Sequence, residues 1–454
     1  MPLKSVTNTP RGLAVEILNR VAITDAYAEP LLDACLSAHY LPNIHDRRLL
    51  TQIVYGVLRM QGRLDWIIRT YYKGDVDSLD VYIRNILRTG LYQLLYTSRI
   101  PFFAVVDEAV KLAKAHRPAG AGLVNAILRT YLRKQGELAY PRLEEDPLEH
   151  ITVVHSHPDW LVRRWMKIFS VEETLALCAA NNEIPPAALR VNLLKTSRNG
   201  VKAELAAEGI ETQETAFSLQ GLVITRQDAS LRTTQSYEKG HVLLQDEASQ
   251  LIGPLLAPPA GGTTLDLCAG TGVKTTHLAE LMTDRGEIMA VDLKDRKLAS
   301  LRELAGKLGV TIVETMAGDA AAELPASWRK KFDRVLVDAP CSGLGTLRRN
   351  PEIKWRLTAQ DIKLNADLQQ RILDRAAGCL KPGGIMVYSV CTIMPEENEA
   401  VIDAFLGRQA EFQLAKPPAA IDNSLVDQKG FFRTNPARHG TDGFFGAVLV
   451  KKIE

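Results

Sequence analysis

The sequence lacks several features that define whole classes of protein. No apolar run reaches the roughly 18 residues that a membrane-spanning helix needs, which argues against an integral membrane protein. Six cysteines among 454 residues, with no pair at metal-ligand spacing, indicate free thiols in a reducing compartment rather than a disulfide framework. Residues 1–11 lack the apolar core of a secretory signal, so we expect a cytoplasmic protein.

Aromatic residues are also scarce, at 6% of the chain, but the composition is otherwise that of a globular protein. Hydrophobic residues make up 46% and charged residues 24%, which excludes a disordered or collagenous chain. A length of 454 residues is enough for roughly two to four domains.

The net charge is only +2, but it is unevenly distributed. Residues 1–140 carry 18 lysines and arginines against 12 aspartates and glutamates, whereas the remainder carries 37 against 41. A basic module favours a polyanionic partner, because contacts to phosphate groups require positive charge. A solvated basic surface without a partner is the alternative, and charge alone does not separate the two.

Hydrophobic periodicity divides the chain into three zones. Residues 1–140 repeat apolar positions at helical spacing and predict a compact helical bundle, in which Asp46 and Asp80 are candidate N-caps. Three prolines and an acidic cluster mark residues 141–158 as a linker. Residues 159–236 mix helical and strand periods, which predicts a small α+β unit.

From residue 240 onward, short β-rich runs alternate with helical stretches, which predicts a parallel, doubly wound α/β sheet. The predicted strands are 264–268, 286–291, 311–314, 333–337 and 384–390, and the predicted helices include 275–282, 296–308 and 359–380. The predicted domains are 1–145 (helical), 146–238 (α+β) and 239–454 (α/β).

A glycine-containing turn follows the first predicted strand of this sheet. Gly270 and Gly272 let the backbone turn tightly and approach a ligand at a helix N-terminus, although a nicotinamide site would want a third glycine where Thr275 stands. Asp292 ends the second strand, where a ribose-binding carboxylate belongs, and Asp319 follows the third, where it could accept a hydrogen bond from adenine. We therefore expect a cofactor with ribose and adenine but no phosphate, such as S-adenosylmethionine. Capping of strand ends by these acids is the alternative.

Two cysteines lie at the same predicted edge of the sheet. Cys341 follows the fourth strand, three residues after Asp338, and Cys391 ends the fifth. A thiolate that adds to carbon 6 of a cytosine makes carbon 5 reactive toward an electrophilic methyl group, and a second group must then remove the carbon-5 proton. Because methylation of a nitrogen needs no such thiol, the pair predicts cytosine-5 methylation. Two buried structural cysteines are the alternative.

Four motifs resemble those of the Fmu/Sun-type RNA cytosine-5 methyltransferases, which modify small-subunit ribosomal RNA. These motifs are residues 266–274, 338–341, 388–392 and 440–445. The helical zone resembles the NusB-like RNA-binding domain that is fused to these enzymes, and residues 189–192 and 245–249 resemble their small pre-catalytic domain. The resemblance implies a Rossmann-like, S-adenosylmethionine-dependent methyltransferase domain behind two front domains, with 16S ribosomal RNA as the substrate.

The resemblance also implies a role for each site residue. Cys391 would attack carbon 6, Cys341 would assist product release, and Asp338 would lie between the methyl donor and the target base. Lys274 would orient the base or lower the pKa of the thiolate through its charge. The donor would be held by Cys268, Ala269, Gly270, Thr271, Gly272, Val273 and Lys274 at its amino-acid end, by Asp292 at its ribose and by Asp319 at its adenine, with Asp338 beside it.

The chain departs from the family pattern in one loop and at one single residue. The family loop usually reads Ala-Ala-Pro-Gly-Gly-Lys where this chain has residues 269–274, and we expect donor binding to survive because the glycines can still turn the chain. The family usually has threonine before the nucleophile, and Val390 at that position cannot make a hydroxyl contact.

Two further segments carry weaker signals. Arg348, Arg349 and Trp355 offer guanidinium groups and an indole near the predicted base pocket, with a solvated surface loop as the alternative. His155 and His157 stand at a spacing that could suggest a metal, but no third ligand is near in sequence. We interpret the two histidines as structural and predict no metal.

Other functions stay open at the level of sequence. A non-catalytic, NusB-like RNA-binding or assembly factor would fit the basic helical zone, and it would bind RNA whether or not a methyl donor is present. A cytosine-5 methyltransferase acting on tRNA or DNA would fit the thiol pair, and in a DNA enzyme Cys341 would be the nucleophile. No heptad seam is present, so we expect a monomer.

Overall fold

The computed structural model describes residues 8–24, 26–38, 41 and 43–453, so the first residues of the segment 1–11 lie outside the described part. The chain divides into two compact units. One contains Met1–Glu183 and Leu347–Arg356, and the other contains Ile184–Thr346 and Leu357–Glu454. Among the described residues, no helix is both long enough and apolar enough to cross a bilayer.

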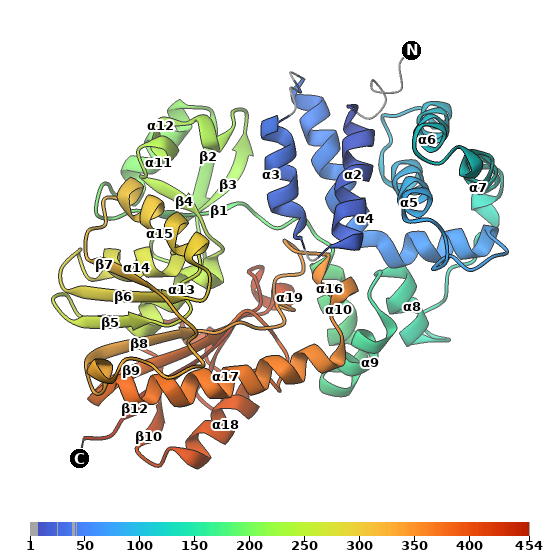
Figure 1. The fold of residues 1–454 in the computed structure, drawn as a ribbon. Coiled ribbons are helices and arrows are strands. Elements are labelled where there is room, and N and C mark those ends of the chain that lie inside the picture. The colour runs from blue at the N-terminus through green and yellow to red at the C-terminus, as the bar shows by residue number, and fades with distance from the viewer. Residues whose placement is uncertain (1–7, 25, 39–40, 42, 454) are drawn as a thin grey trace. The chain divides into compact units, whose positions relative to one another are not determined.

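The first unit is helical, because its apolar residues recur every three to four positions and give each helix a face to bury. Its helices are α2 (Pro10–Ile23), α3 (Ala28–Ala38), α4 (Ile44–Tyr71), α5 (Val81–Tyr96), α6 (Phe102–His116), α7 (Ala121–Lys134), α8 (Pro147–Val154), α9 (Asp159–Ile168), α10 (Val171–Asn181) and the single turn α16 (Ile353–Arg356) (Figure 1). Helix α5 is buried around most of its circumference and packs against α2, α4, α6 and α7. The predicted helical bundle is therefore confirmed, with α5 at its centre.

The two predicted N-caps had different outcomes. Asp80 caps α5, since its Oδ1 accepts a hydrogen bond from the Tyr82 amide at 2.9 Å. The prediction for Asp46 was wrong, because α4 begins earlier and Asn43 caps it. Asp46 instead lies in the first turn of α4, where a negative charge is favourable beside the helix dipole.

Part of the predicted linker at 141–158 is also helical, which corrects that prediction. Helix α8 begins at Pro147, a residue whose fixed φ suits the first helical position. Asp146 caps the helix by accepting from the Glu149 amide at 2.9 Å. One of the prolines and one of the acids that indicated a linker, Pro147 and Asp146, thus form the start of a helix.

The second unit opens with a small antiparallel sheet. Its elements are β1 (Ala188–Val191), α11 (Arg198–Ala207), β2 (Ile210–Glu214), β3 (Gly221–Gln227), α12 (Gln235–Glu238) and β4 (Val242–Leu244). The strand order is β2-β3-β1-β4, and every pair is antiparallel. Leu189, Val191, Val201 and Leu205 are buried between β1 and α11, which makes this the α+β unit that the sequence predicts.

A larger sheet follows in the same unit. Its strands are β5 (Thr263–Asp266), β6 (Glu287–Asp292), β7 (Val313–Ala317), β8 (Phe332–Asp338), β9 (Leu380–Val390), β10 (Phe412–Ala415), β11 (Phe432–Arg433) and β12 (Phe445–Lys451). The order is β10-β12-β9-β8-β5-β6-β7, with β11 beside β12. The five predicted strands correspond to β5–β9, which run parallel, whereas β10, β11 and β12 pair antiparallel and were not predicted.

Helices cover both faces of this sheet, as a doubly wound fold requires (Figure 1). The helices are α13 (Glu247–Leu256), α14 (Val273–Leu281), α15 (Asp295–Leu308), α17 (Ala359–Cys379), α18 (Glu399–Arg408) and α19 (Pro436–His439). Successive side chains of β8 point to opposite faces: Val335 and Val337 pack in one core with α17 and α18, and Leu336 packs in the other with α13, α14 and α15.

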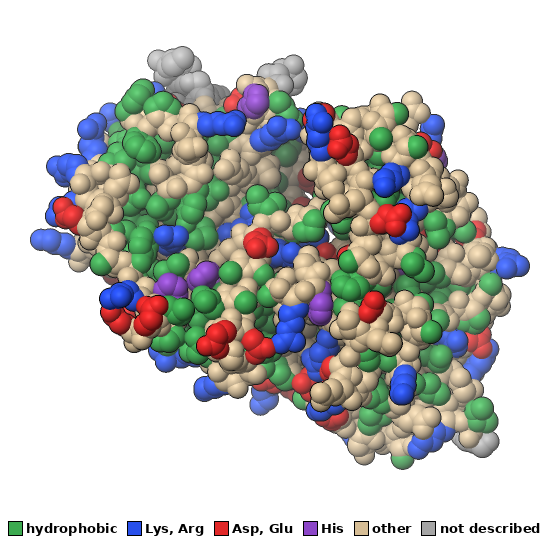
Figure 2. Space-filling model, turned by 180° about the vertical axis from the view of Figure 1, so that it is seen from behind, with side chains coloured by type: hydrophobic (Ala, Val, Ile, Leu, Met, Phe, Trp, Pro, Cys, Tyr) green, Lys and Arg blue, Asp and Glu red, His purple; other side chains and the backbone are tan. Residues whose placement is uncertain are grey.

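The charges on one face of the molecule are mixed. Figure 2 shows lysine and arginine side chains spread over the visible face, with aspartate or glutamate beside several of them, and they do not gather there into a single basic patch.

Candidate functional site

The carboxyl ends of the parallel strands bring the predicted site residues to one edge of the sheet. Asp292 is the last residue of β6, Asp338 is the last residue of β8, and Cys391 directly follows β9. The glycine loop leads from β5 into α14. Ligands of open α/β sheets bind at this edge, so the sequence placed these residues at a suitable location.

The two cysteines meet at this edge of the sheet. Their Sγ atoms lie 3.3 Å apart, and both thiols are free and half-buried. The hydrogen bond with Cys391, together with burial, raises the pKa of Cys341 well above its ordinary value. Cys341 is therefore held as a protonated thiol beside Cys391.

An ion pair lies at the same edge. The Lys274 ammonium donates to Asp338 Oδ2 at 2.7 Å, and the Ser389 hydroxyl donates to Asp338 Oδ1 at 2.8 Å. Burial alone would lower the pKa of Lys274, but the Asp338 carboxylate and the charge of Cys391 outweigh it and raise the pKa. Lys274 is thus a fixed cation that interacts with one of the two thiols, and the ring of Phe444 lies 5.1 Å from its Nζ.

The glycine loop is tightly folded and pinned by Asp292. Gly270 and Gly272 have φ values of +58° and +86°, which favour glycine. A Cβ at Gly272 would lie 2.4 Å from Leu301 Cγ, whereas a Cβ at Gly270 would meet no atom within 4 Å. The Gly270 amide donates to Asp292 Oδ2 at 3.0 Å. The loop therefore presents open space on the Gly270 side and close packing on the Gly272 side.

The two other predicted acids also accept hydrogen bonds from nearby backbone. Asp292 Oδ1 accepts from the Lys294 amide at 2.9 Å, and Asp319 Oδ1 accepts from the Ala321 amide at 2.9 Å. Both acids therefore cap nearby backbone, which is the alternative role that the sequence left open for them. A carboxylate has about four lone-pair sites, so capping leaves acceptor capacity for ligand hydroxyl or amino groups. Together with the open side of Gly270, these acids fit a nucleoside-containing donor.

Asp266 is a buried acid beneath the loop that sequence reasoning did not single out. It accepts a hydrogen bond from the Thr275 hydroxyl at 2.7 Å. Burial raises its pKa to about 7. Its place at the end of β5, inside the first motif, was the signal that could have identified it.

Arg190 is a second missed residue, and it connects the small sheet to α14. It is fully buried and forms an ion pair of 2.8 Å with Glu280. It also donates to the Gln245 side chain at 2.6 Å, to the carbonyl of Val273 at 2.6 Å and to the Thr276 hydroxyl at 3.1 Å. Because Val273 directly precedes Lys274, this guanidinium anchors the helix turn that carries the site lysine.

The segment 347–356 belongs to the helical unit. Neither of the two interpretations drawn from the sequence, a segment at the base pocket or a solvated surface loop, describes it. The Trp355 indole donates to the carbonyl of Leu58 at 2.6 Å, so it is engaged in holding the segment rather than presented for base stacking. The segment is not a solvated loop either, because Arg348 is 2% exposed and Lys354 is 1% exposed. The Lys354 ammonium donates to the carbonyl of Arg59 at 2.9 Å, and burial lowers its pKa to about 7.

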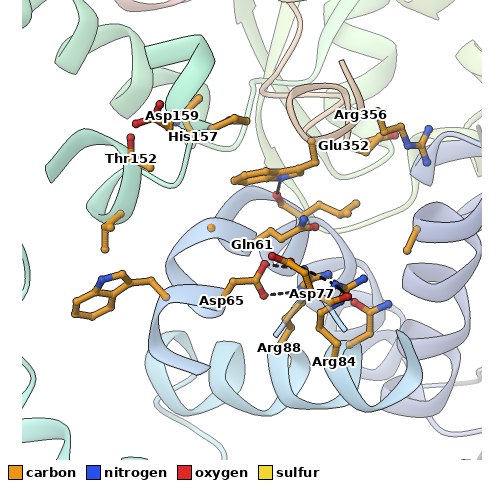
Figure 3. A pocket seen from close by; sticks show the side chains of 18 of the residues that line it. Gln61, Asp65, Asp77, Arg84, Arg88, Thr152, His157, Asp159, Glu352 and Arg356 are labelled. Atoms are coloured by element: carbon orange, nitrogen blue, oxygen red, sulfur yellow. Dashed lines mark hydrogen bonds and ion pairs between the residues drawn. The ribbon is translucent and has the colours of Figure 1, made fainter. Parts of the chain in front are cut away.

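A cavity of about 590 Å³ lies within the helical unit. Figure 3 shows Asp65 and Arg88 facing each other at its wall, where both oxygens of the carboxylate accept from the guanidinium at 2.7 Å. Arg84 lies 3.6 Å from Asp77, also at the wall. The cavity therefore combines both signs of charge: Arg84 and Arg88 face carboxylates, whereas Arg356 donates to the backbone carbonyls of Val21 and Ala26.

Comparison with known families assigns each zone of the chain. Residues 254–450 match the family described as 16S rRNA methyltransferase RsmB/F. Residues 8–133 match the NusB family, and residues 157–229 match the ferredoxin-like domain of RsmF/B-like methyltransferases. The predicted fold class, with helical, α+β and Rossmann-like parts, is confirmed.

Similar proteins match over nearly the whole chain. A probable ribosomal RNA small subunit methyltransferase B of Bacillus subtilis is 33% identical, over 97% of this chain and 98% of its own length. A protein with the same description from Synechocystis is 36% identical, over 97% of this chain and 99% of its own length.

Two solved structures support the same assignment. The crystal structure of PH0851 is 29% identical, with a TM-score of 0.83, and the match covers 99% of both chains. A methyltransferase homolog protein from Pyrococcus horikoshii is 28% identical, with a TM-score of 0.56, over 66% of this chain and 97% of that one. The resemblance drawn from the motifs is thereby confirmed, and the chain belongs to the RsmB/F family of 16S rRNA methyltransferases.

Proposed function

We propose that this protein transfers a methyl group from S-adenosylmethionine to carbon 5 of a cytosine in 16S ribosomal RNA, through a covalent bond between Cys391 and the base. The observation that carries the proposal is the pair of thiols 3.3 Å apart at the edge of the sheet. Family membership supports methyl transfer to ribosomal RNA, and the thiols support carbon 5 as the acceptor, because a nitrogen acceptor needs no thiol.

In the first step the Cys391 thiolate adds to carbon 6 of the cytosine, and the electron pair of the ring double bond moves to carbon 5. The bound donor supplies a methyl group on a positively charged sulfur. Carbon 5 attacks this methyl group while still holding its hydrogen, and the bond between the methyl carbon and the donor sulfur breaks, so that an uncharged thioether leaves. Once the adduct exists, Cys341 gives its own proton to solvent, and its thiolate then takes the carbon-5 hydrogen as a proton. The ring double bond re-forms, and the bond between carbon 6 and Cys391 breaks to return the thiolate. One proton is released for each methyl group transferred.

The contact between the thiols supports this division of roles. In the free protein, the hydrogen bond with Cys391 and its charge both raise the pKa of Cys341. Bond formation at Cys391 turns that sulfur into an uncharged thioether and removes both causes. Cys341 therefore loses its proton more readily once the adduct exists, which is when a base is needed.

Asp338 and Lys274 complete the proposed site. Lys274 supplies a fixed positive charge that interacts with Cys391. Asp338, held by Lys274 and Ser389, would accept a hydrogen bond from the exocyclic amino group of the cytosine. The donor would lie along residues 268–274, with Asp292 at its ribose and Asp319 at its adenine. The front domains would bind the RNA.

The test uses an unmodified 16S rRNA transcript and a donor with a radioactive methyl group. Digestion of the RNA to nucleosides should yield labelled 5-methylcytidine. Cys391→Ala should abolish transfer, whereas Cys341→Ala should leave a protein–RNA adduct that survives a denaturing gel. Cys35→Ala, which removes a half-buried thiol in the other compact unit, should behave like the unchanged protein.

Full activity of Cys391→Ala, or label on a nitrogen, would refute the proposal. If Cys341→Ala, and not Cys391→Ala, abolished the adduct, the two thiols would have reversed roles. Labelling of a tRNA or DNA substrate in place of the 16S transcript would replace the substrate. The domain boundaries at 145 and 238, the monomeric state and the cytoplasmic location stay predictions.

A further inference from the structure

Each site cysteine is followed by a residue with a hydroxyl group, and these two hydroxyl groups are hydrogen-bonded to each other. Ser342 follows Cys341 and Thr392 follows Cys391, and their hydroxyl oxygens lie 2.8 Å apart. The Ser342 amide donates to Glu397 Oε1 at 2.8 Å, and the Ser342 hydroxyl donates to Glu397 Oε2. One carboxylate thus holds the backbone and side chain of the residue after Cys341, which in turn contacts the residue after Cys391.

Glu397 is itself rigidly held. Its side chain is fully buried in the turn before α18, and Gln369 from α17 donates to its Oε1 at 3.1 Å. The Tyr388 hydroxyl donates to the Glu397 carbonyl at 2.6 Å. Burial raises the pKa of Glu397, while the donors from Ser342 and Gln369 oppose the shift because they favour the carboxylate.

We propose that Glu397 is a positioning residue that sets the separation of the two thiols and so lets Cys341 clear the covalent adduct. The inference rests on the proposed function, since it assigns no chemistry without an adduct. Glu397 touches neither thiol by a hydrogen bond in the structure and acts through Ser342 and Thr392.

The charge of Glu397 adds a measurable consequence. The ionisable groups around Cys341 are Tyr388 from β9, Cys391 directly after β9, Glu397 from the turn before α18, and the nearby pair of Lys274 and Asp338. Among these, the Glu397 charge contributes to the raised pKa of Cys341. This contribution persists in the adduct, when the hydrogen bond with Cys391 is gone. A neutral isostere at Glu397 should therefore move adduct release to lower pH.

The experiment compares Glu397→Ala, Glu397→Gln and Cys341→Ala on the 16S transcript with labelled donor. Misplacement of a catalytic group by 1 Å costs about 100-fold in rate, so Glu397→Ala should turn over about 100-fold more slowly and accumulate labelled adduct as Cys341→Ala does. Glu397→Gln keeps an oxygen for the Ser342 amide, so it should release product much faster than Glu397→Ala, with a pH profile displaced to lower pH. Asp403→Asn removes an exposed carboxylate from α18 and should change nothing.

The same gel separates failure of this inference from failure of the proposed function. Adduct in Cys341→Ala but none in Glu397→Ala, or turnover of Glu397→Ala at the normal rate, overturns the inference alone. Absence of adduct in Cys341→Ala overturns the proposed function and the inference with it. If Glu397→Ala does not fold, Glu397→Gln decides: a displaced release profile supports the inference, and an unchanged profile overturns it.

Discussion

The buried ion pair between Arg190 and Glu280 gives the sharpest stability prediction, because both side chains are fully excluded from solvent. Removal of one partner from a buried pair leaves an uncompensated charge and costs about 3–5 kcal/mol. Arg190→Leu also removes the donors to Val273 and Thr276 in the first turns of α14. We therefore expect the cost to appear as local opening of α14 and of β1, which carries Arg190.

Hydrogen–deuterium exchange of the full chain measures this cost directly. Because each factor of ten in an equilibrium corresponds to about 1.4 kcal/mol, peptides from β1 and α14 should exchange roughly 100- to 5,000-fold faster in Arg190→Leu. Arg198→Leu is the matched control. Arg198 pairs with Glu214 at the same 2.8 Å, but the two side chains are 25% and 49% exposed. Such pairs contribute about 0–1 kcal/mol.

The double variant Arg190→Leu with Glu280→Leu tests the reason for the cost. If the uncompensated charge dominates, the double variant should exchange more slowly than Arg190→Leu alone, because no charge is left buried. Equal exchange in Arg190→Leu and Arg198→Leu would refute the reasoning, and so would a double variant whose cost equals the sum of the two single ones.

Two further predictions concern the buried acid Asp266 and the glycine loop of the site. The pKa of Asp266 rises from 3.8 to about 7 on folding, so the folded chain retains a proton that the unfolded chain loses, and stability should fall by about 4 kcal/mol as pH rises from about 4 to about 7. Asp266→Asn should flatten that fall in urea unfolding, and an unchanged slope would count against a buried acid. Gly272→Ala should weaken donor binding, measured by calorimetry, because a Cβ there would lie 2.4 Å from Leu301 Cγ. Gly261→Ala, with a similar φ of +81° but open space around it, controls for backbone strain, and equal donor affinity in both variants would contradict the packing argument.

The sequence was sufficient to place the residues at the edge of the sheet. Asp292, Asp338 and Cys391 each end or follow a β-rich run, and parallel strands necessarily bring their carboxyl ends together. This rule needs only the strand positions, and those follow from short apolar runs between helical stretches. The closeness of Cys341 and Cys391 is a consequence of the same rule, since β8 and β9 are neighbours.

Other features depend on tertiary packing and left no local pattern. Strand β10 follows α18, but only a short turn at Asn423–Leu425 and the four-residue α19 lie between β10, β11 and β12, so the regular alternation with long helices that revealed β5–β9 ends there. The segment 347–356 resembles an exposed basic loop in composition, yet it is anchored to the helical unit by Trp355 and Lys354. A charged residue is buried only where its partners are, and those partners are distant in sequence.

Two of the residues that the sequence analysis missed share a physical character, which explains both why no motif revealed them and what they do. Arg190 and Glu397 are buried charged groups whose partners lie 90 and 55 residues away in sequence, at Glu280 and Ser342. Neither lies at the reactive edge, but each holds a residue next to one that does: Arg190 holds Val273 beside Lys274, and Glu397 holds Ser342 beside Cys341. Because a buried polar network is stable only when its members are paired, such groups fix position more strictly than apolar packing does. The chemistry at the edge of the sheet therefore depends on buried charged residues that hold the reactive ones in place, and the spacing of motifs in the sequence does not reveal them.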